Sequence, residues 1–330
     1  MEAATGINGT DPETVREKLI TEIAWMNEVS LSMGRPVTFG LAQGREALDA
    51  YAKVLQQVEE STAKGAIIRP QSTARGIGVL FGFVNRTPFD RAASWRSLRG
   101  RPLAEKVTML RDADYRTRMI QDAIDNMPPM DWNDLFLLSQ DEVRYDHQPQ
   151  ESLQAYADRL GVSVPEAFVS LSLEQDGRAL FNYPFLNPEY EAVEAMLAHP
   201  QVVIGLGDSG AHCGQIMDAS LPTYYLTYWV RERERFPLEL AIRKLTSEPA
   251  ELYSLPDRGA IRPGAYADIN VFDFEQLRLA APEFVHDFPT GSGRYIQKSS
   301  GYPYTLVNGE VFMEGLEHTG ALAGTVLRSQ

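Results

Sequence analysis

The chain has 330 residues, of which 44% are hydrophobic and 23% charged, values typical of a globular protein with one large domain or two smaller ones. Its 45 acidic and 31 basic side chains leave a formal net charge of −14, which argues against nucleic acid and anionic membrane as partners because both need basic surfaces. The sequence has no apolar run of about 18 residues and no signal pattern at its amino terminus, and its single cysteine, Cys213, excludes an internal disulfide. We therefore expect a cytoplasmic protein without a membrane span.

The first 70 residues predict parallel strand–helix–strand units. A helix over residues 11–32 begins at Asp11 with Pro12 at its first position, and Gly34 ends it. A strand follows at 37–41, then an amphipathic helix at 44–62 and a second strand at 66–69. This alternation is typical of a parallel sheet covered by helices.

Residues 77–185 read as a long insertion rather than as further units of this kind. Helical patterns occur near 103–125, 152–160 and 164–174, and Asn182–Phe185 reads as an aromatic-rich turn. The aromatic residues Trp95, Trp132 and Phe136 are expected to pack the insertion. A lid over a site is the alternative interpretation, since long insertions often cover sites.

After the insertion the pattern returns to a helix at 189–198 and a third strand at 201–206. Mostly helical sequence follows over 217–247, and short strands and turns begin near residue 258.

The run GLGDSGAH at residues 205–212 is the strongest candidate for chemistry. It follows the apolar residues 202–204, so Asp208 is expected where a parallel strand ends and its loop begins, which is where α/β barrels place their chemistry. A carboxylate there can bind a metal ion or accept a proton from water. The alternative for Asp208 is a helix N-cap.

A second run, DRGAIRPGAYADINVFD at residues 257–273, resembles the end of an amidohydrolase-superfamily enzyme, and more closely the N-acyl-D-amino-acid deacylase (D-aminoacylase) branch. The helix-like segment 236–246, the pair Pro249-Ala250 and the closing segments 307–311 and 319–328 support this resemblance. It implies an α/β fold: the C-terminal part of a metal-dependent (β/α)8 TIM barrel over 1–250, and a small composite β-sandwich domain over 251–330. The strands at 37–41, 66–69 and 201–206 look like barrel strands six, seven and eight.

The resemblance also implies a divalent metal, zinc by family, but the usual ligands are missing. No two of the five histidines are two residues apart, so the family's His-x-His pair has no counterpart. The sixth strand ends at Gln43 where related deacylases carry a histidine, which suggests an altered metal site. The absence of strands one to five leads us to expect the C-terminal part of a longer enzyme.

By this resemblance Asp208 is both the catalytic acid/base and a metal ligand. His212 and Ser209, in the same loop, are candidates to contact substrate, although each has an ordinary loop role as its alternative. Arg75, with Arg69, is the candidate for the substrate carboxylate, because guanidinium binds carboxylate in a bidentate manner. A salt bridge within this acidic chain is the alternative for Arg75. Gln43 is expected to hold a water or the substrate amide. We interpret Cys213 as an inert small hydrophobe, and His147, His199, His286 and His318 as surface residues.

Two functions remain open. The first is a hydrolase of carbon–nitrogen amide bonds that acts on N-acyl amino acids by metal-activated water. The second is a non-catalytic fragment or subunit that needs a partner chain for strands one to five, or that forms a homo-oligomer, since missing strands would leave an open sheet edge.

Overall fold

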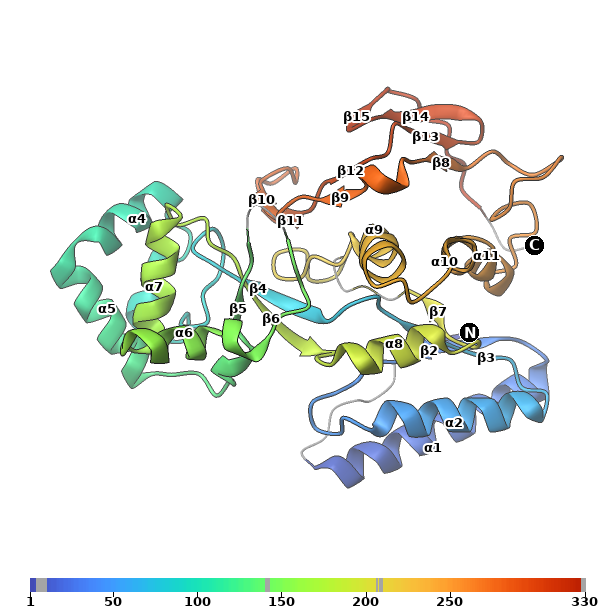
Figure 1. Cartoon of the computed structure of the whole chain (residues 1–330), viewed down its shortest axis with the longest axis horizontal. Coiled ribbons are helices and arrows are strands. Elements are labelled where there is room, and N and C mark those ends of the chain that lie inside the picture. Colours follow the sequence, from blue (N-terminus) through green and yellow to red (C-terminus); the bar gives the residue numbers. More distant parts are fainter. Residues whose placement is uncertain (4–10, 140–142, 206, 208–209, 328–330) are drawn as a thin grey trace.

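The computed structural model describes residues 1–3, 11–139, 143–205, 207 and 210–327 (Figure 1). In this part of the chain the central sheet is parallel and has the strand order β1-β2-β3-β7. Its strands are β1 (Glu2–Ala3), β2 (Val37–Gly40), β3 (Ile68–Ser72) and β7 (Val203–Ile204). The three strands expected from the sequence are confirmed within a few residues. β1 was missed because two residues are too few to display a strand pattern.

Helices α1 (Pro12–Met33) and α2 (Ala50–Ala63) cover one face of this sheet. The Asp11 carboxylate caps α1 by accepting a hydrogen bond from the Thr14 N–H at 3.0 Å, and Gly34 ends the helix in the left-handed region at φ 61°. Apolar side chains of both helices meet the sheet in a closed core that contains Ile23, Phe39 and Val58. α2 begins six residues later than expected because residues 44–49 form turns, and Gly44 bridges to Ala47 and Leu186.

Helices α10 (Leu238–Leu245) and α11 (Ser247–Leu252) pack against β7, and α8 (Tyr190–Ala198) packs against α2 and β3. The segment before α10 is helical, as expected: α9 (Leu221–Tyr224) runs into a π-helical stretch, Tyr225–Glu232. That stretch buries Tyr225 and Trp229 in the second core of the protein.

The insertion forms a separate helical lobe, residues 93–174, which lies at the left of Figure 1. Its helices are α3 (Ala93–Leu98), α4 (Leu103–Arg111), α5 (Ala113–Asp125), α6 (Leu153–Leu160) and α7 (Val164–Glu174), with 3₁₀ turns at Trp132–Asp134 and Pro149–Glu151. The expected packing role of Trp95, Trp132 and Phe136 is confirmed, since all three are buried.

An antiparallel sheet in the order β4-β6-β5 joins the lobe to the rest of the molecule. Its strands are β4 (Ile77–Phe81), β5 (Phe136–Leu137) and β6 (Phe181–Leu186). The interpretation of Asn182–Phe185 as a turn is therefore wrong. Pairing with β4, more than a hundred residues earlier, holds these residues extended despite Pro184.

The carboxyl-terminal strands, residues 269–318, form a sheet in the order β15-β14-β13-β8 and the two ladders β12-β9 and β10-β11. Their bounds are β8 (Ile269–Val271), β9 (Arg278–Leu279), β10 (Glu283–Val285), β11 (Arg294–Ile296), β12 (Ser299–Ser300), β13 (Tyr304–Val307), β14 (Glu310–Glu314) and β15 (Glu317–His318), with a 3₁₀ turn at Phe274–Gln276. The short-strand pattern beyond 258 is confirmed, whereas a division into domains at residue 250, within α11, stays a proposal. No helix among the described residues is long and apolar enough to cross a membrane.

Candidate functional site

The carboxyl ends of β2 and β3 are tied together by a buried side chain from the segment between β6 and α8. Asn187 Oδ1 accepts a hydrogen bond from the Gln43 N–H at 2.7 Å, and Asn187 Nδ2 donates to Thr73 Oγ1 at 2.9 Å. Because parallel strands end at one edge, this network lies at the edge where α/β folds place their sites. Of the site residues expected from the sequence, Gln43 lies in this network, which is closed by contacts that span more than a hundred residues.

Gln43 lies in this network, but its side-chain amide is occupied by protein groups. Its Nε2 donates to Glu189 Oε2 at 2.6 Å and to Leu48 O at 3.1 Å, and its Oε1 accepts from the Glu189 N–H at 3.1 Å. These bonds hold the segment before α8 against the loop after β2. In this arrangement Gln43 shapes the edge of the sheet rather than offering a free amide to a ligand.

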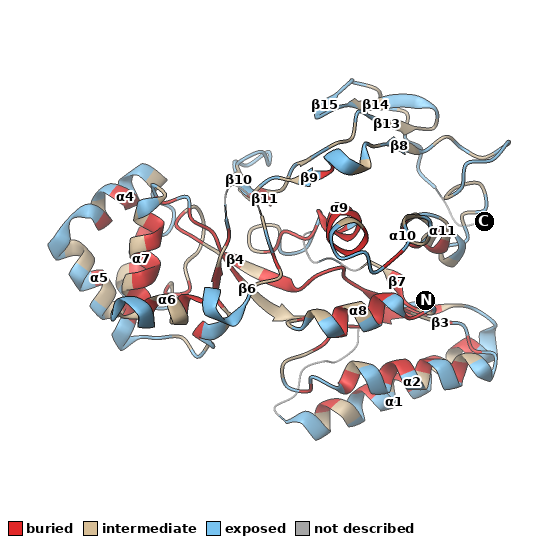
Figure 2. Ribbon diagram, in the orientation of Figure 1, coloured by how far each residue is buried: buried red, intermediate tan, exposed pale blue. Residues whose placement is uncertain are grey.

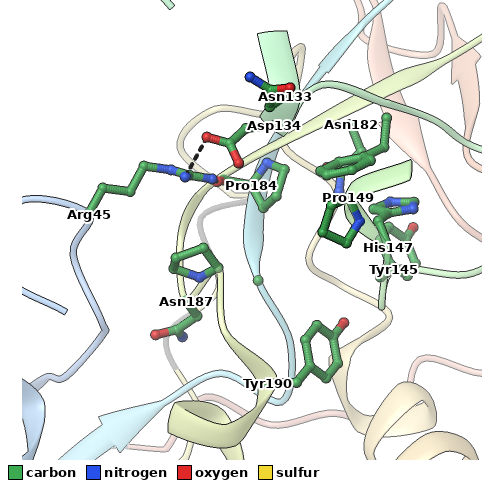
Figure 3. A pocket seen from close by; sticks show the side chains of 13 residues that line it. Arg45, Asn133, Asp134, Tyr145, His147, Pro149, Asn182, Pro184, Asn187 and Tyr190 are labelled. Atoms are coloured by element: carbon green, nitrogen blue, oxygen red, sulfur yellow. Dashed lines mark hydrogen bonds and ion pairs between the residues drawn. The ribbon is translucent and has the colours of Figure 1, made fainter. Parts of the chain in front are cut away.

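A polar pocket of about 300 Å³ opens next to this network (Figure 3). Arg45 spans one side of it and pairs with Asp134, with Nη1 and Oδ2 2.5 Å apart. In this view His147 and Tyr145 lie on the side opposite Arg45, and Tyr190 lies below them. The other lining residues are Gly76, Asn133, Phe136, Pro149, Asn182, Pro184, Asn187 and Pro188.

The pocket holds polar atoms that have no protein partner among the described residues. His147 Nε2 and Asn182 Oδ1 are both buried without a hydrogen bond. Burial lowers the pKa of His147 to about 4, so its ring is neutral at physiological pH. Burial also raises the pKa of the Asp134 carboxyl, against the opposing effect of Arg45. A neutral imidazole and a free amide oxygen suit an uncharged polar ligand group, because each buried atom costs free energy until it is bonded.

Arg75 is enclosed in protein and has acceptors of its own. Its side chain is 2% exposed and lies 3.5 Å from Asp218 Oδ1, while its Nη2 donates to Met217 O. The guanidinium carbon also lies 3.8 Å from the centroid of the Tyr145 ring. The structure thus has the salt bridge that was the alternative for Arg75, and the paired guanidinium is withdrawn from the pocket.

Arg69 is the second residue of β3 and does not line the polar pocket. Its Nη2 lies 3.7 Å from Glu248 Oε2 of α11, and Glu248 also pairs with Arg243 and Lys244. On the same face, Gln71 Nε2 donates to Thr38 Oγ1 at 2.8 Å. This face of the sheet is polar, whereas the face under α1 and α2 is apolar.

Asp208 and Ser209 lie outside the described residues. The residues on either side of them are described: the Gly205 N–H donates to Ser72 O at 3.0 Å, so the loop leaves β7 directly beside the end of β3. His212 is exposed, and its backbone oxygen accepts from the N–H groups of Gln215 and Ile216. His212 lies in a different cleft from the polar pocket, beside Cys213.

The described residues do not fit a metal centre. No group of three or more His, Cys, Asp or Glu side chains among them is arranged to hold a metal ion. At the end of β2, where a ligand is expected by resemblance, Gln43 is bonded to Glu189. A divalent cation would need ligands that this part of the chain does not present.

Two histidines interpreted as surface residues are not. His199 is buried beside Glu59, with Nε2 3.2 Å from Oε1, and His147 stacks on Phe136 in the polar pocket. The sequence contains no signal for either position, because their neighbours in space come from distant segments. A local sequence signal beside the pocket is the pair Asn187-Pro188, because both residue types are common in turns.

The Amidohydrolase family model matches residues 14–313, and the chain belongs to this family. Its characterised relatives place it in the D-aminoacylase branch. An N-acyl-D-glutamate deacylase of Alcaligenes xylosoxydans xylosoxydans is 39% identical over 87 residues, which are 26% of this chain and 16% of that protein. An N-acyl-D-aspartate deacylase of the same organism is 39% identical over 99 residues, 30% of this chain and 18% of that protein.

The solved structures that resemble the chain support the same fold. A D-aminoacylase crystal structure superposes with a TM-score of 0.55 at 18% identity and covers 99% of this chain and 56% of its own. A D-aminoacylase mutant in complex with CuCl2 gives a TM-score of 0.54 with the same identity and coverage. The chain therefore spans about half the length of the solved proteins it matches. The expected α/β class is confirmed, and the fold is that of D-aminoacylases over this span.

Proposed function

We propose that the chain carries part of the catalytic face of a hydrolase that cleaves the amide bond of N-acyl amino acids. The observation that carries this proposal is the position of the GLGDSGAH run. The run begins at Gly205, directly after the last residue of β7, and the Gly205 N–H is bonded to the end of β3, in a chain of the amidohydrolase family. Asp208 follows Gly205 by three residues in the sequence, and we propose that it acts at the edge where such folds place their reacting groups.

In this proposal Asp208 is the general base and then the general acid. Its carboxylate accepts a proton from water as the water oxygen bonds to the acyl carbon, and it returns that proton to the nitrogen as the carbon–nitrogen bond breaks. The products are a carboxylic acid and a free amine, which ionise in water to a carboxylate and an ammonium. The polar pocket beside the strand ends would hold the uncharged amide, with His147 and Asn182 supplying a neutral donor or acceptor. The loop residues Ser209 and His212 remain proposed substrate contacts. The other substrate-binding candidates from the sequence were Arg75, Arg69 and Gln43.

The substrate class follows from the relatives. Their names specify N-acyl-D-glutamate and N-acyl-D-aspartate, so we propose N-acyl derivatives of D-amino acids as substrates. We also propose zinc as the divalent cation, by family, with Asp208 as one ligand and with the others supplied from outside the described residues. The single cysteine favours a cytoplasmic site of action.

The test is release of free amine from N-acetyl-D-glutamate and N-acetyl-D-aspartate, with their L-enantiomers as controls. Wild type, Asp208→Asn and Asp125→Asn are assayed side by side, with and without added zinc. Asp125 is a matched control because it is an exposed aspartate on α5, in the helical lobe. We expect the Asp208 variant to lose at least about a hundredfold in rate, the typical scale of general acid–base catalysis, and the Asp125 variant to keep its rate. Equal activity of the Asp208 variant would contradict the proposed role.

A second proposal concerns a partner, and the open central sheet favours it. In the described chain β1 and β7 are the outer strands of a parallel sheet that does not close on itself. Such edges attract further strands. Sedimentation of the purified chain tests this: self-association, or a complex with a chain that supplies more strands, would support a covered edge, and a stable active monomer would refute it.

A further inference from the structure

A second cleft of about 1050 Å³ lies where three distant segments meet, and we call it the basic cleft. The first segment leads into the helical lobe and contributes Val84, Asn85, Arg86 and residues 99–103 with Lys106. The second is the loop Ala211–Gln215, which begins with the last two residues of the GLGDSGAH run. The third is the β10–β11 hairpin, with Phe284, His286 and residues 291–293. Apart from the 211–215 loop, these segments have no place in the proposed reaction.

Hydrogen bonds join the three segments that line the basic cleft. The Tyr295 N–H donates to Cys213 O at 2.8 Å, which ties the hairpin to the loop. The Leu80 N–H donates to Gln215 O at 2.7 Å, and Asn85 Nδ2 donates to Gly214 O, which tie the loop to the base of the lobe. The cleft walls are therefore fixed relative to one another.

The charge of the cleft is opposite to that of the protein. Its described lining contains Arg86, Arg99, Arg101 and Lys106 together with His212 and His286, and no aspartate or glutamate. The whole chain carries a net charge of −14. Four cationic side chains around one concavity repel one another, and in an acidic protein nearby carboxylates would be the simplest way to neutralise them.

Most of these cations have little compensation from the protein. In the described part of the chain no ion pair to an acid is formed by Arg86 or Arg99, whereas Arg101 pairs with Glu105 on α4. Lys106 is 6% exposed, its Nζ donates to Phe83 O at 2.8 Å, and burial lowers the pKa of its ammonium, with Asp90 opposing that effect. A buried ammonium with one neutral acceptor gains most from an anion placed against it.

We propose that the basic cleft binds a small polyanion, a compact molecule with two or more carboxylate or phosphate groups. Guanidinium groups bind either oxyanion through paired N–H donors, and the buried ammonium of Lys106 adds a point charge. The volume is that of a metabolite-sized ligand. The site is separate from the polar pocket, and the two share no lining residue among those described.

The experiment is calorimetric titration of the full chain with citrate and, separately, with inorganic pyrophosphate, each at low and at physiological ionic strength. Acetate and chloride serve as monovalent controls. We expect one site per chain for at least one of the two polyanions, with binding weakened by salt because the cations are partly exposed. Binding of citrate alone would assign the site to carboxylates, and binding of pyrophosphate alone would assign it to phosphates. Binding of both would assign it to oxyanions in general.

The location is tested by paired variants that remove equal charge. Arg86→Gln/Arg99→Gln removes two cations of the cleft, and Arg35→Gln/Arg118→Gln removes two arginines elsewhere on the molecule. The cleft variant should lose at least about tenfold in affinity, the scale of one charge-assisted hydrogen bond, and the control should keep wild-type affinity. Equal losses in both variants, or no polyanion binding by wild type, would overturn the proposal. Circular dichroism of each variant verifies folding.

Cys213 offers an independent readout because it lines the cleft and is the one cysteine in the sequence. A bound polyanion should slow alkylation of its thiol by iodoacetamide several-fold in wild type but not in the cleft variant. An unchanged rate at saturating anion would place the anion elsewhere.

Discussion

The helical lobe and the carboxyl-terminal strands differ sharply in how they bury apolar side chains (Figure 2). In the lobe and its connecting strands, aromatic rings form a closed cluster: Phe168 stacks on Phe181 with centroids 4.3 Å apart and meets Phe89 edge-on at 5.4 Å. Among the carboxyl-terminal strands, Val271, Val311 and Leu316 are exposed. Beyond residue 255, the buried apolar side chains in the described chain are Leu277 and Tyr295.

Both regions contain regular helices or strands, so they differ in tertiary packing rather than in secondary structure. Helices α3 to α7 surround one another and exclude water from a common centre. No residue in the strands of the sheet β15-β14-β13-β8 is buried, so these strands depend largely on backbone hydrogen bonds, which contribute little net free energy in water. We therefore expect core substitutions in the lobe to cost far more stability than substitutions in the sheet.

The largest effect is expected for Phe168→Ala. Phe168 is fully buried, and its removal leaves a cavity among rings that cannot close over it. The free energy of unfolding should fall by about 3–5 kcal/mol. Urea unfolding followed by tryptophan fluorescence measures it, since Trp95 and Trp132 report on this cluster. A loss below about 1 kcal/mol would mean that the lobe core is loosely packed.

Gly82→Ala tests how tightly the lobe is joined to the strands beneath it. A Cβ at residue 82 would lie 2.5 Å from the backbone oxygen of Ala179, which cannot rotate away. We expect a loss of about 1–3 kcal/mol, typical of overpacking. Gly324→Ala is the control, because a Cβ there meets nothing within 4 Å. Equal melting temperatures for the two variants would contradict the close approach.

The pH dependence of stability is expected to carry a contribution from His147, at the boundary of the lobe. Burial lowers the pKa of its folded form to about 4, below the unfolded value near 6.5. Between these values the unfolded chain binds more protons, so stability falls as the pH falls, by up to about 3 kcal/mol.

His147→Gln should flatten the stability profile between pH 4 and 6.5. His318→Gln, at an exposed position of the carboxyl-terminal strands, is the matched control and should keep the wild-type slope. Denaturation midpoints measured across this range decide between them. A profile that His147→Gln leaves unchanged would show that the ring protonates freely in the folded protein.

The smallest effect is expected for Val311→Ala on β14. Its side chain is 38% exposed, and truncation should change the free energy of unfolding by less than about 0.5 kcal/mol. The same urea titration measures it. A loss in the free energy of unfolding of about 2 kcal/mol or more that grows with protein concentration would reveal that a second copy covers this sheet. The sheet and the lobe would then no longer differ in how they bury apolar side chains.

Local signals in the sequence were enough to predict α1, α6, α7 and α8 near their observed bounds, and the parallel strands β2, β3 and β7 within a few residues. Asp11, Pro12 and Gly34 mark the ends of α1, and the alternation of strands and helices indicated a parallel sheet. Caps, turns and apolar periods act within one or two turns of chain, so they can be recognised without knowing the fold. The family resemblance also rested on contiguous runs. β6 was missed because pairing with β4, a distant strand, rather than local preference holds it extended.

The site depended on contacts between distant segments. Arg75 was a reasonable carboxylate ligand from its place after β3, but Asp218, more than 140 residues later, pairs with it inside the protein. His147 read as a surface residue until Phe136 and the strands around it formed the polar pocket. Burial and charge pairing depend on which segments meet in space. The chemistry available at each residue type can therefore be read along the chain, whereas the partner, charge state and accessibility of each side chain are set by the tertiary fold.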